Sequence, residues 1–482
     1  MLKTSKVAES KPRPEEVGFI FNKDGEVSGL NPNTFSRYIT KKITLRFSPE
    51  ELFYEYKNGV FLLRKEAALK AMLYRIVNSI VPDSWRSSFE TQYLQALQNR
   101  VYSAEGMNHQ KNMLNLSNCM LDINNMKTCE HDPAFKSTIR IPLAYDPSAQ
   151  CPRFKQFLEE VFDGDKERIT IAEEIMGYCL TAETKGQKAF LLYGSGSNGK
   201  SVFCEVLRQL CGTENVSSVS LNEMKNSFAR LDLVNKTVNL VTETEVNGTS
   251  FNTEFFKAIV AGDPIRTEVK HGPSFTITPT VKIVAAMNTL PFAKDQTYGL
   301  TRRLLILPFE KQFVGKEIDV NLLDELKKEM AGIFNLAIKG LKRLRKQEYR
   351  FTQSSKVDAE LKEYQETISP ITAFVDEMIV ESSKESRVRN KVLRRLFGVW
   401  CKDRGHNKIA EMSENRFHSL LKNALRDRRI EFGSEKSGGE RYVSGIELNV
   451  TGKSALEKIP GYAPSKLKIV TDMSEFDPLE EE

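Results

Sequence analysis

Residues 188–201 read Lys-Ala-Phe-Leu-Leu-Tyr-Gly-Ser-Gly-Ser-Asn-Gly-Lys-Ser, a short apolar run that enters a glycine-rich loop. From Gly194 to Ser201 the run matches the pattern GxxxxGK[ST] at every position. The residues that follow place Val202, Val206 and Leu210 on one face of a helix. This order of strand, loop and helix predicts a phosphate-binding loop, because glycines let backbone N–H groups converge on phosphate oxygens and the helix N-terminus adds positive potential.

The loop also predicts the ligands that a nucleoside triphosphate needs. We expect Lys200 to neutralise the β- and γ-phosphates and the Ser201 hydroxyl to bind Mg²⁺. The predicted cofactors are therefore ATP and Mg²⁺, and the predicted ATP-binding residues are Gly194, Ser195, Gly196, Ser197, Asn198, Gly199, Lys200 and Ser201. The simpler alternative is a strand-to-helix turn that happens to be rich in glycine. Taken alone, the motif indicates a P-loop NTPase and does not separate a helicase from a kinase or a protein remodeller.

A second β-prone run, residues 236–245, ends in two carboxylates. NTPases of this class need one carboxylate at a strand end to organise Mg²⁺ and another to position and polarise the attacking water. We assign Glu243 to the metal, together with Ser201, and Glu245 to the water, and the two roles are exchangeable. The alternative is a strand end whose carboxylates are only solvated.

Two further apolar runs carry polar residues at their ends. Residues 281–287 end at Asn288, whose carboxamide could donate to the γ-phosphate or to the attacking water. Arg302 and Arg303 open the run 304–309, and a guanidinium stabilises charge on a transferring phosphoryl group, also across a subunit interface. We favour Arg303 for this role because it adjoins the strand. A turn asparagine and an ordinary surface pair of arginines are the simpler alternatives.

This ordered set, between residues 194 and 303, resembles the superfamily 3 helicases, and within them the poxvirus-type branch found in phage and plasmid primase–helicases. The resemblance extends upstream to residues 114–122, 141–147 and 174–178, and downstream to a C-terminal winged-helix-like unit. It covers residues 100 to 450. Many relatives carry a primase domain ahead of the helicase, but residues 1–100 show no paired-carboxylate metal signature, so primase activity is not expected from them.

Residues 263–279 predict a β-hairpin with Lys270, His271 and Gly272 at its tip, because apolar positions alternate on both sides of this turn. In the helicases that the chain resembles, such a hairpin projects into a central channel. The resemblance therefore implies that Lys270 and His271 contact the DNA backbone, as a cation and a hydrogen-bond donor at a loop tip can do for any sequence. A surface hairpin with a polar turn is the alternative.

The C-terminal part predicts a second DNA-binding surface. We expect a basic helix from Arg387, a second helix over 413–426 with Ser413 as its N-cap, and a hairpin wing around residues 438–439. The alternative is a charged helical lid whose basic residues are only solvated. The predicted DNA-binding residues here are Arg387, Arg389, Lys391, Arg394, Arg395 and Arg441.

The composition fits a soluble globular protein, with 40% hydrophobic and 28% charged residues. A net charge of +6 permits nucleic-acid binding but does not argue for it. The seven cysteines never form CxxC, which indicates reduced thiols and supports neither a disulfide framework nor a zinc site. A polar N-terminus and the lack of an apolar run of about 18 residues predict a cytoplasmic protein without a membrane partner.

The predicted fold class is α/β: an AAA+-like P-loop motor with a mixed α+β N-terminal region and a C-terminal winged-helix-like domain. The expected domains are an accessory region of unknown role (1–100), a family-type region before the motor (101–164), the motor (165–370), the basic winged-helix-like domain (371–450) and a flexible acidic tail (451–482).

The expected activity is that of an ATP-dependent replicative DNA helicase of a phage or mobile genetic element. Such an ATP hydrolase would act as a homo-hexameric ring on single-stranded and forked DNA, with a separate primase or another replication protein as a further partner. The alternatives are an initiator that binds and melts an origin with weak helicase activity, a protein-remodelling AAA+ ATPase and a small-molecule P-loop kinase. Lys270 and His271 speak against a remodeller, which needs aromatic or apolar tips on its pore loops.

Overall fold

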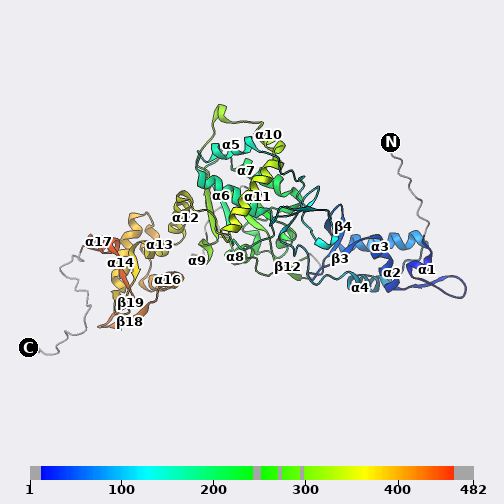
Figure 1. Cartoon of the computed structure of the whole chain (residues 1–482). Coiled ribbons are helices and arrows are strands. Elements are labelled where there is room, and N and C mark those ends of the chain that lie inside the picture. The colour runs from blue at the N-terminus through cyan, green and yellow to red at the C-terminus, as the bar shows by residue number, and fades with distance from the viewer. Residues whose placement is uncertain (1–11, 243–250, 270–273, 292, 294–297, 461–482) are drawn as a thin grey trace, which may run out of the picture.

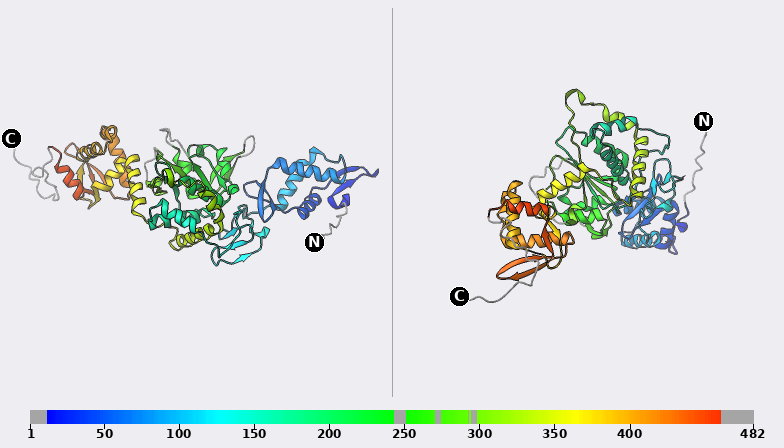
Figure 2. Two further views of the ribbon diagram at one scale, coloured as in Figure 1. Left: turned by 90° about the horizontal axis from the view of Figure 1, so that it is seen from above. Right: turned by 60° about the vertical axis from the view of Figure 1, so that its left-hand side comes forward.

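The computed structural model describes residues 12–242, 251–269, 274–291, 293 and 298–460. These residues form an elongated molecule in which an N-terminal unit, a central unit and a C-terminal unit follow one another (Figures 1 and 2). Among the described residues, no helix combines the length and the apolar character needed to cross a bilayer.

The N-terminal unit, residues 12–104, is a small α+β body. Phe35, Leu73, Tyr93 and Leu97 are among the residues buried in its core. Strands β4 and β5 pair antiparallel on either side of a tight turn at Asn58-Gly59, and both turn residues have positive φ. Its elements are α1 (Pro14–Val17), β1 (Phe19–Phe21), β2 (Val27–Leu30), α2 (Pro32–Lys42), β3 (Leu45–Phe47), β4 (Phe53–Lys57), β5 (Val60–Arg64), α3 (Glu66–Ile80) and α4 (Glu90–Val101).

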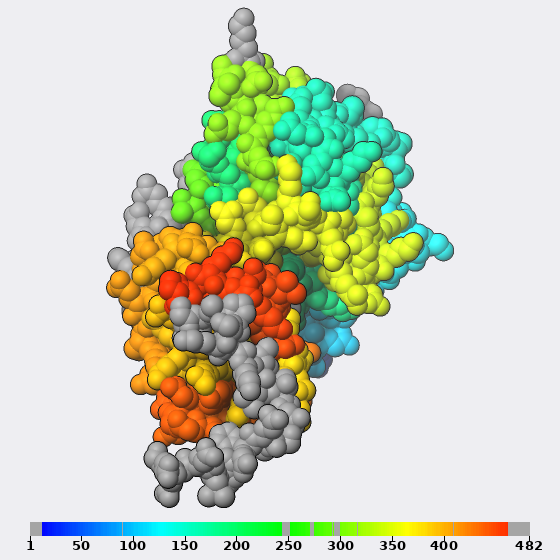
Figure 3. Space-filling view, turned by 90° about the vertical axis from the view of Figure 1, so that its left-hand side faces the viewer, coloured from blue at the N-terminus to red at the C-terminus, as the bar shows by residue number. Residues whose placement is uncertain are grey.

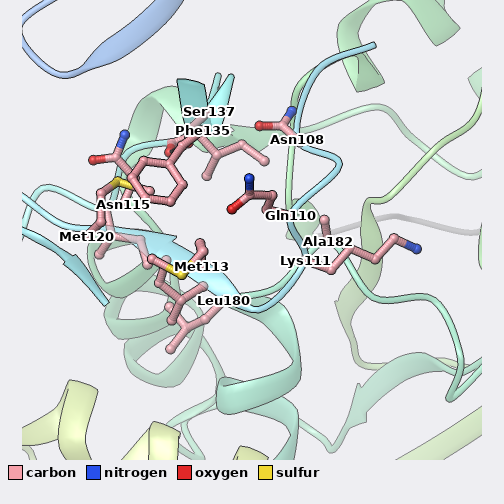
Figure 4. A pocket seen from close by; sticks show the side chains of 13 residues that line it. Asn108, Gln110, Lys111, Met113, Asn115, Met120, Phe135, Ser137, Leu180 and Ala182 are labelled. Atoms are coloured by element: carbon pink, nitrogen blue, oxygen red, sulfur yellow. Dashed lines mark hydrogen bonds between the residues drawn. The ribbon is translucent and has the colours of Figure 1, made fainter. Parts of the chain in front are cut away.

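A linking region, residues 105–151, joins this unit to the central one. It holds the antiparallel strands β6 (Met113–Asn115), β7 (Met120–Asp122) and β8 (Thr128–Cys129). The β4–β5 turn docks here, where Asn115 Nδ2 donates to Gly59 O at 2.7 Å and Phe61 N donates to Ser137 O at 2.8 Å. A small cavity of about 30 Å³ lies beside Asn115 and Ser137 and reaches Leu180 of the central unit (Figure 4). That volume is room for about one water molecule.

The central unit, residues 152–368, is built on a parallel five-stranded sheet of order β10-β11-β14-β9-β15. The mixed α/β architecture with parallel strands agrees with the prediction. Both faces of this sheet are apolar and buried, as strand β9 illustrates. Phe190 and Leu192 pack into the hydrophobic cluster on one face, and Ala189 and Leu191 pack into the cluster on the other. The strands are β9 (Ala189–Tyr193), β10 (Val216–Ser217), β11 (Val238–Thr242), β14 (Lys282–Met287) and β15 (Leu304–Pro308).

Helices cover the two faces of the sheet (Figure 1). One face packs against α5 (Pro152–Val161), α6 (Lys166–Cys179), α7 (Lys200–Cys211), α10 (Leu322–Lys328) and α11 (Met330–Lys346). The other face packs against α8 (Thr253–Ala261), α9 (Tyr298–Thr301) and α12 (Ser355–Ile368). Because α5 is part of the first group, the central unit begins before residue 165, the boundary expected from sequence. The short antiparallel strands β12 (Ile265–Glu268) and β13 (Ser274–Ile277) form the arms of the predicted hairpin.

Helix α12 carries the chain from the central to the C-terminal unit. It packs on β15, and Tyr364 Oη donates to Pro291 O at 2.6 Å. The chain then bends at Ser369, directly before Pro370 begins α13. In the space-filling view the segment that contains α12 lies between the two units (Figure 3).

The C-terminal unit, residues 369–460, encloses its own core around Phe374, Phe397, Trp400 and Phe417. Strands β17, β19 and β18 form an antiparallel sheet in that order, and β16 pairs with β20. The elements are α13 (Pro370–Met378), β16 (Ile379–Glu381), β17 (Arg387–Arg389), α14 (Asn390–Asp403), α15 (Asn407–Ala410), α16 (Glu414–Asp427), β18 (Gly433–Ser437), β19 (Glu440–Ser444), β20 (Ile446–Leu448) and α17 (Val450–Glu457).

Two expectations for this unit are corrected. The basic helix begins at Asn390 and not at Arg387, because residues 387–389 pair with β19 as a strand and turn Val388 toward the core between two arginines. Residues 450–457 form helix α17, which buries Leu456, so the part of the predicted flexible tail from 451 to 457 is packed. The remaining tail from 461 onward lies outside the described residues.

Candidate nucleotide-binding site

The predicted phosphate loop joins β9 to α7 at the carboxyl edge of the parallel sheet. Gly196 and Gly199 have φ of +106° and +84°, which L side chains rarely adopt. Gly199 also lies against α5: a Cβ atom at this position would approach Val161 Cγ1 to 2.6 Å and the Phe157 ring to 3.2 Å. The glycines therefore serve both the turn of the loop and its close approach to α5.

Hydrogen bonds hold the side chains of this loop in one arrangement. Lys200 Nζ donates to Gly194 O at 2.7 Å and to Asn198 Oδ1 at 2.9 Å. Asn198 is buried, and its Nδ2 donates to Phe309 O at 2.9 Å, which ties the loop to the end of β15. Burial lowers the pKa of Lys200 from its ordinary value. The lysine lies where an anionic ligand would compete with the Asn198 and Gly194 oxygens for its ammonium group.

A cleft of about 1090 Å³ opens at this loop. Asn288, at the carboxyl end of β14, lies on its wall and is exposed, and Thr242 at the end of β11 lines it too. Strands β14 and β15 flank β9, and crevices beyond the carboxyl ends of parallel strands are where α/β proteins bind ligands. The predicted ATP-binding residues on the cleft wall are Gly196, Ser197, Asn198, Gly199, Lys200 and Ser201.

The cleft is also lined by residues that the sequence did not assign to a binding site. Phe157, Phe313, Ile318 and Leu322 contribute apolar surface there, and Arg153 adds a guanidinium. Arg153 lies within 4 Å of three carboxylates, of which Asp319 is 3.6 Å away. The cleft thus combines the polar phosphate loop with apolar surface, which suits a phosphorylated ligand that carries a flat ring.

Four predicted residues cannot be placed. Glu243 and Glu245, and likewise Lys270 and His271, lie outside the described residues. Thr242, which directly precedes Glu243 in the sequence, lines the cleft.

Arg302 and Arg303 lie at the opposite edge of the sheet from the phosphate loop. Ala189 N, at the amino end of β9, donates to Arg303 O at 2.7 Å, whereas the loop follows the carboxyl end of the same strand. Five residues of strand separate the two ends by about 17 Å. Arg302 is exposed, and its Nη1 donates to Gln187 Oε1 at 3.0 Å. Arg303 is half-buried and donates to Gly299 O. Neither guanidinium is therefore near the phosphate loop of its own chain.

One buried side chain behind the loop was missed by the sequence analysis. Arg168 on α6 is 2% exposed and donates to Phe162 O at 3.0 Å and Pro308 O at 3.1 Å. It also pairs with Asp165 at 2.8 Å and Glu310 at 2.9 Å. These bonds hold the carboxyl end of β15, to which Asn198 is bonded. No motif marks Arg168, since two of its acceptors, Pro308 and Glu310, are distant in sequence.

The predicted basic residues of the C-terminal unit differ in their surroundings. Arg389, Arg395 and Arg441 are exposed. Arg387 lies over the Tyr442 ring at 4.8 Å, and Lys391 pairs with Glu440 at 2.9 Å.

Arg394 differs from these, because its guanidinium donates to the Ala410 and Met412 carbonyls. Its contacts favour a structural role.

Helix α16 presents a polar face that the sequence analysis did not assign. Arg416, Ser419, Asn423 and Arg426 are exposed along it, whereas Phe417 and the other apolar residues of the helix face the core. The spacing of three to four residues between these polar residues is the sequence signal for such a face. The DNA-binding residues were instead predicted in the more densely basic run at 387–395.

Two family models match parts of this chain. Residues 86–163 match the family described as D5 N terminal like, and residues 192–303 match a family of unknown function, DUF5906. A putative helicase, L207/L206 of Acanthamoeba polyphaga mimivirus, is 26% identical over 164 residues, which are 33% of this chain and 17% of that protein. The aligned part thus spans less than a fifth of that relative.

Solved structures share the fold over most of the chain. The apo structure of the NrS-1 C terminal region (305-718) has a TM-score of 0.51 at 13% identity and covers 86% of this chain and 98% of that one. The A form apo structure of the NrS-1 C terminal region gives 0.50 at 13%, again with 86% and 98% covered. Together with the D5-like region, the viral relative links this chain distantly to helicase-type proteins of DNA replication.

Proposed function

We propose that this protein is an ATP-dependent replicative DNA helicase of a phage or mobile genetic element, with a superfamily 3, AAA+-type motor in its central unit. The observation that carries the proposal is the cleft, which brings Lys200, Ser201 and Asn288 together beyond the carboxyl ends of β9 and β14. A glycine loop, a helix N-terminus and a lysine suit the phosphates of ATP. Bound Mg²⁺ would neutralise phosphate charge, with Ser201 and Glu243 as its expected ligands.

The position of the arginine pair supports catalysis between subunits. Because Arg302 and Arg303 lie about 17 Å from the phosphate loop of their own chain, they can stabilise a transferring phosphoryl group only in a neighbouring subunit. Exposure favours Arg302 as the group that reaches across, and Arg303 as its anchored neighbour. This arrangement fits the proposed ring, for which a hexamer is expected.

The experiment measures ATP hydrolysis with and without single-stranded DNA, and unwinding of a forked duplex. Lys200→Ala should abolish hydrolysis. Mixing Lys200→Ala subunits with subunits that carry Arg302→Ala and Arg303→Ala should restore part of it, because mixed interfaces combine an intact loop with intact arginines. Normal turnover by Lys200→Ala would refute the assigned site, and a mixture no more active than its components would refute the role in trans.

An initiator that binds and melts an origin is the second candidate. The succession of α13, β17, α14, α16, β18 and β19 and the exposed polar face of α16 support this candidate, because a helix followed by a hairpin can dock on duplex DNA. Preferential binding of one duplex sequence, with little unwinding of a forked substrate, would favour the initiator. Stimulation of hydrolysis by single-stranded DNA of any sequence would favour the helicase.

A further inference from the structure

The segment between β15 and α10 exposes apolar side chains beside the nucleotide cleft. We call residues 312–320 the rim segment; it leads into α10 at the top of Figure 1. Val314, Ile318 and Val320 are 65%, 55% and 85% exposed. In the described part of the chain, no other stretch of seven residues carries three exposed large hydrophobic side chains. Such a patch marks a contact surface more often than a free one.

The rim segment is bonded directly to the phosphate loop. Phe313 N donates to Ser197 O at 2.7 Å, and Gln312 Nε2 donates to Ser195 Oγ at 2.7 Å. Near its other end, Asp319 lies 3.6 Å from the Arg153 guanidinium of α5. The segment is thus held at both ends, and the exposure of its valines does not come from a loose loop.

The cleft beside this segment is incomplete within one chain. Arg302 and Arg303, the arginines that would complete the cleft, lie on the opposite edge of the sheet. A second copy of the chain could supply its own arginines only by placing that edge of its sheet at the cleft opening of the first copy. The charges of the two surfaces are complementary: Glu317 is exposed on the rim segment, and Lys185 and Arg302 are exposed on the opposite edge. A second copy of this chain therefore fits the rim segment in charge and in position.

We propose that the rim segment is the docking surface for a second copy of this chain, which covers Val314 and Val320 when the cleft closes between subunits. The inference rests on the proposed function, because it takes the arginine pair to act in trans. It adds that the contact is apolar at its centre and is connected to the phosphate loop through Ser195 and Ser197. Nucleotide binding and subunit contact should therefore influence each other.

The test replaces Val314 and Val320 with serine in the full chain. Neither valine lines the cleft, whereas Ile318 does and is left unchanged. Val450→Ser is the matched control, because Val450 is also 85% exposed but lies on α17 in the C-terminal unit. Sedimentation velocity over a range of protein concentrations measures assembly, and titration with a fluorescent ATP analogue measures nucleotide binding by each variant.

The double variant should assemble at least tenfold more weakly than the wild type and the control, with its affinity for the nucleotide analogue unchanged under conditions where every chain is a monomer. Assembly equal to that of the wild type would overturn the proposal, as would a wild type that stays a single subunit at every concentration. Thermal unfolding reports whether the double variant folds. If it does not, Val320→Thr, which keeps the shape of the side chain, replaces it with the same expected direction.

The two hypotheses fail in different ways. If the wild type neither binds nor hydrolyses ATP but the double variant still loses assembly, the docking surface stands and the proposed function falls. If hydrolysis is stimulated by single-stranded DNA while assembly is unaffected by the double variant, the proposed function stands and the docking surface falls.

Discussion

Replacing Gly199 with alanine tests whether the phosphate loop depends on its close approach to α5. The added Cβ atom would lie 2.6 Å from Val161 Cγ1, a distance that real Cβ contacts do not show. Gly196→Ala is the matched control: its φ of +106° is also unfavourable for alanine, but nothing lies within 4 Å of its added Cβ. The control therefore isolates backbone strain from the steric clash.

The magnitudes follow from these two contributions. An L residue held at positive φ costs about 1–2 kcal/mol, and this part is common to both variants. Overpacking against α5 costs a further 1–3 kcal/mol, roughly, and only Gly199→Ala suffers it. If the loop relieves the clash by moving, nucleotide affinity falls by the same order, about 5-fold to 150-fold beyond the control.

Thermal unfolding and titration with a fluorescent ATP analogue measure the two effects. Val161→Ala removes the clashing atom, so combining it with Gly199→Ala should show a favourable coupling of about 0.5–3 kcal/mol in a double-mutant cycle. The same cycle with Gly196→Ala should show none. Equal behaviour of the two glycine variants, or a cycle with no coupling to Val161, would refute the reasoning.

Three further predictions concern other parts of the molecule. Burial lowers the pKa of Lys282 to about 7, so between pH 7 and 10 the unfolded chain binds a proton that the folded chain lacks. The stability of the wild type relative to Lys282→Met, measured by urea unfolding, should therefore rise by about 1.4 kcal/mol per pH unit in that window. Taking this difference removes the contributions of Lys188 and the buried cysteines, whose pKa values are also shifted. Replacing Arg416 and Arg426 with alanine should weaken binding to any duplex and reduce the salt slope by about two, measured by fluorescence anisotropy. Arg394→Ala should leave the salt slope unchanged but destabilise the C-terminal unit by about 1–3 kcal/mol in thermal unfolding, because the Ala410 and Met412 carbonyls lose their donor.

The strands and loops of the central unit could be predicted because their signals are local. The run 188–201 contains its own strand, turn glycines and helix start. Ile265 and Thr267 likewise predicted a hairpin arm. They alternate with charged residues, and side chains of a strand point to alternate faces.

What could not be predicted depends on contacts between distant residues. Arg168 is buried because carbonyls and carboxylates from two separate segments converge on it, and no local pattern encodes that convergence. The apolar surface of the cleft is similar, since Phe157 and Leu322 both line it but come from distant segments of the chain. The basic run that begins at Arg387 was predicted to be helical from its own sequence. Residues 387–389 are instead a strand, because they pair with β19.

Helix α12 gives the molecule the geometry of a lever. Its 14 residues span about 21 Å, with one side fixed on β15 and its end at the bend of Ser369 that begins the C-terminal unit. A tilt of about 10° at the start of α12 would displace its far end by about 4 Å over that length. The polar face of α16, in the C-terminal unit, would move with it. Small movements at the end of β15, where Asn198 and Arg168 are bonded, would thus become larger movements of the C-terminal unit.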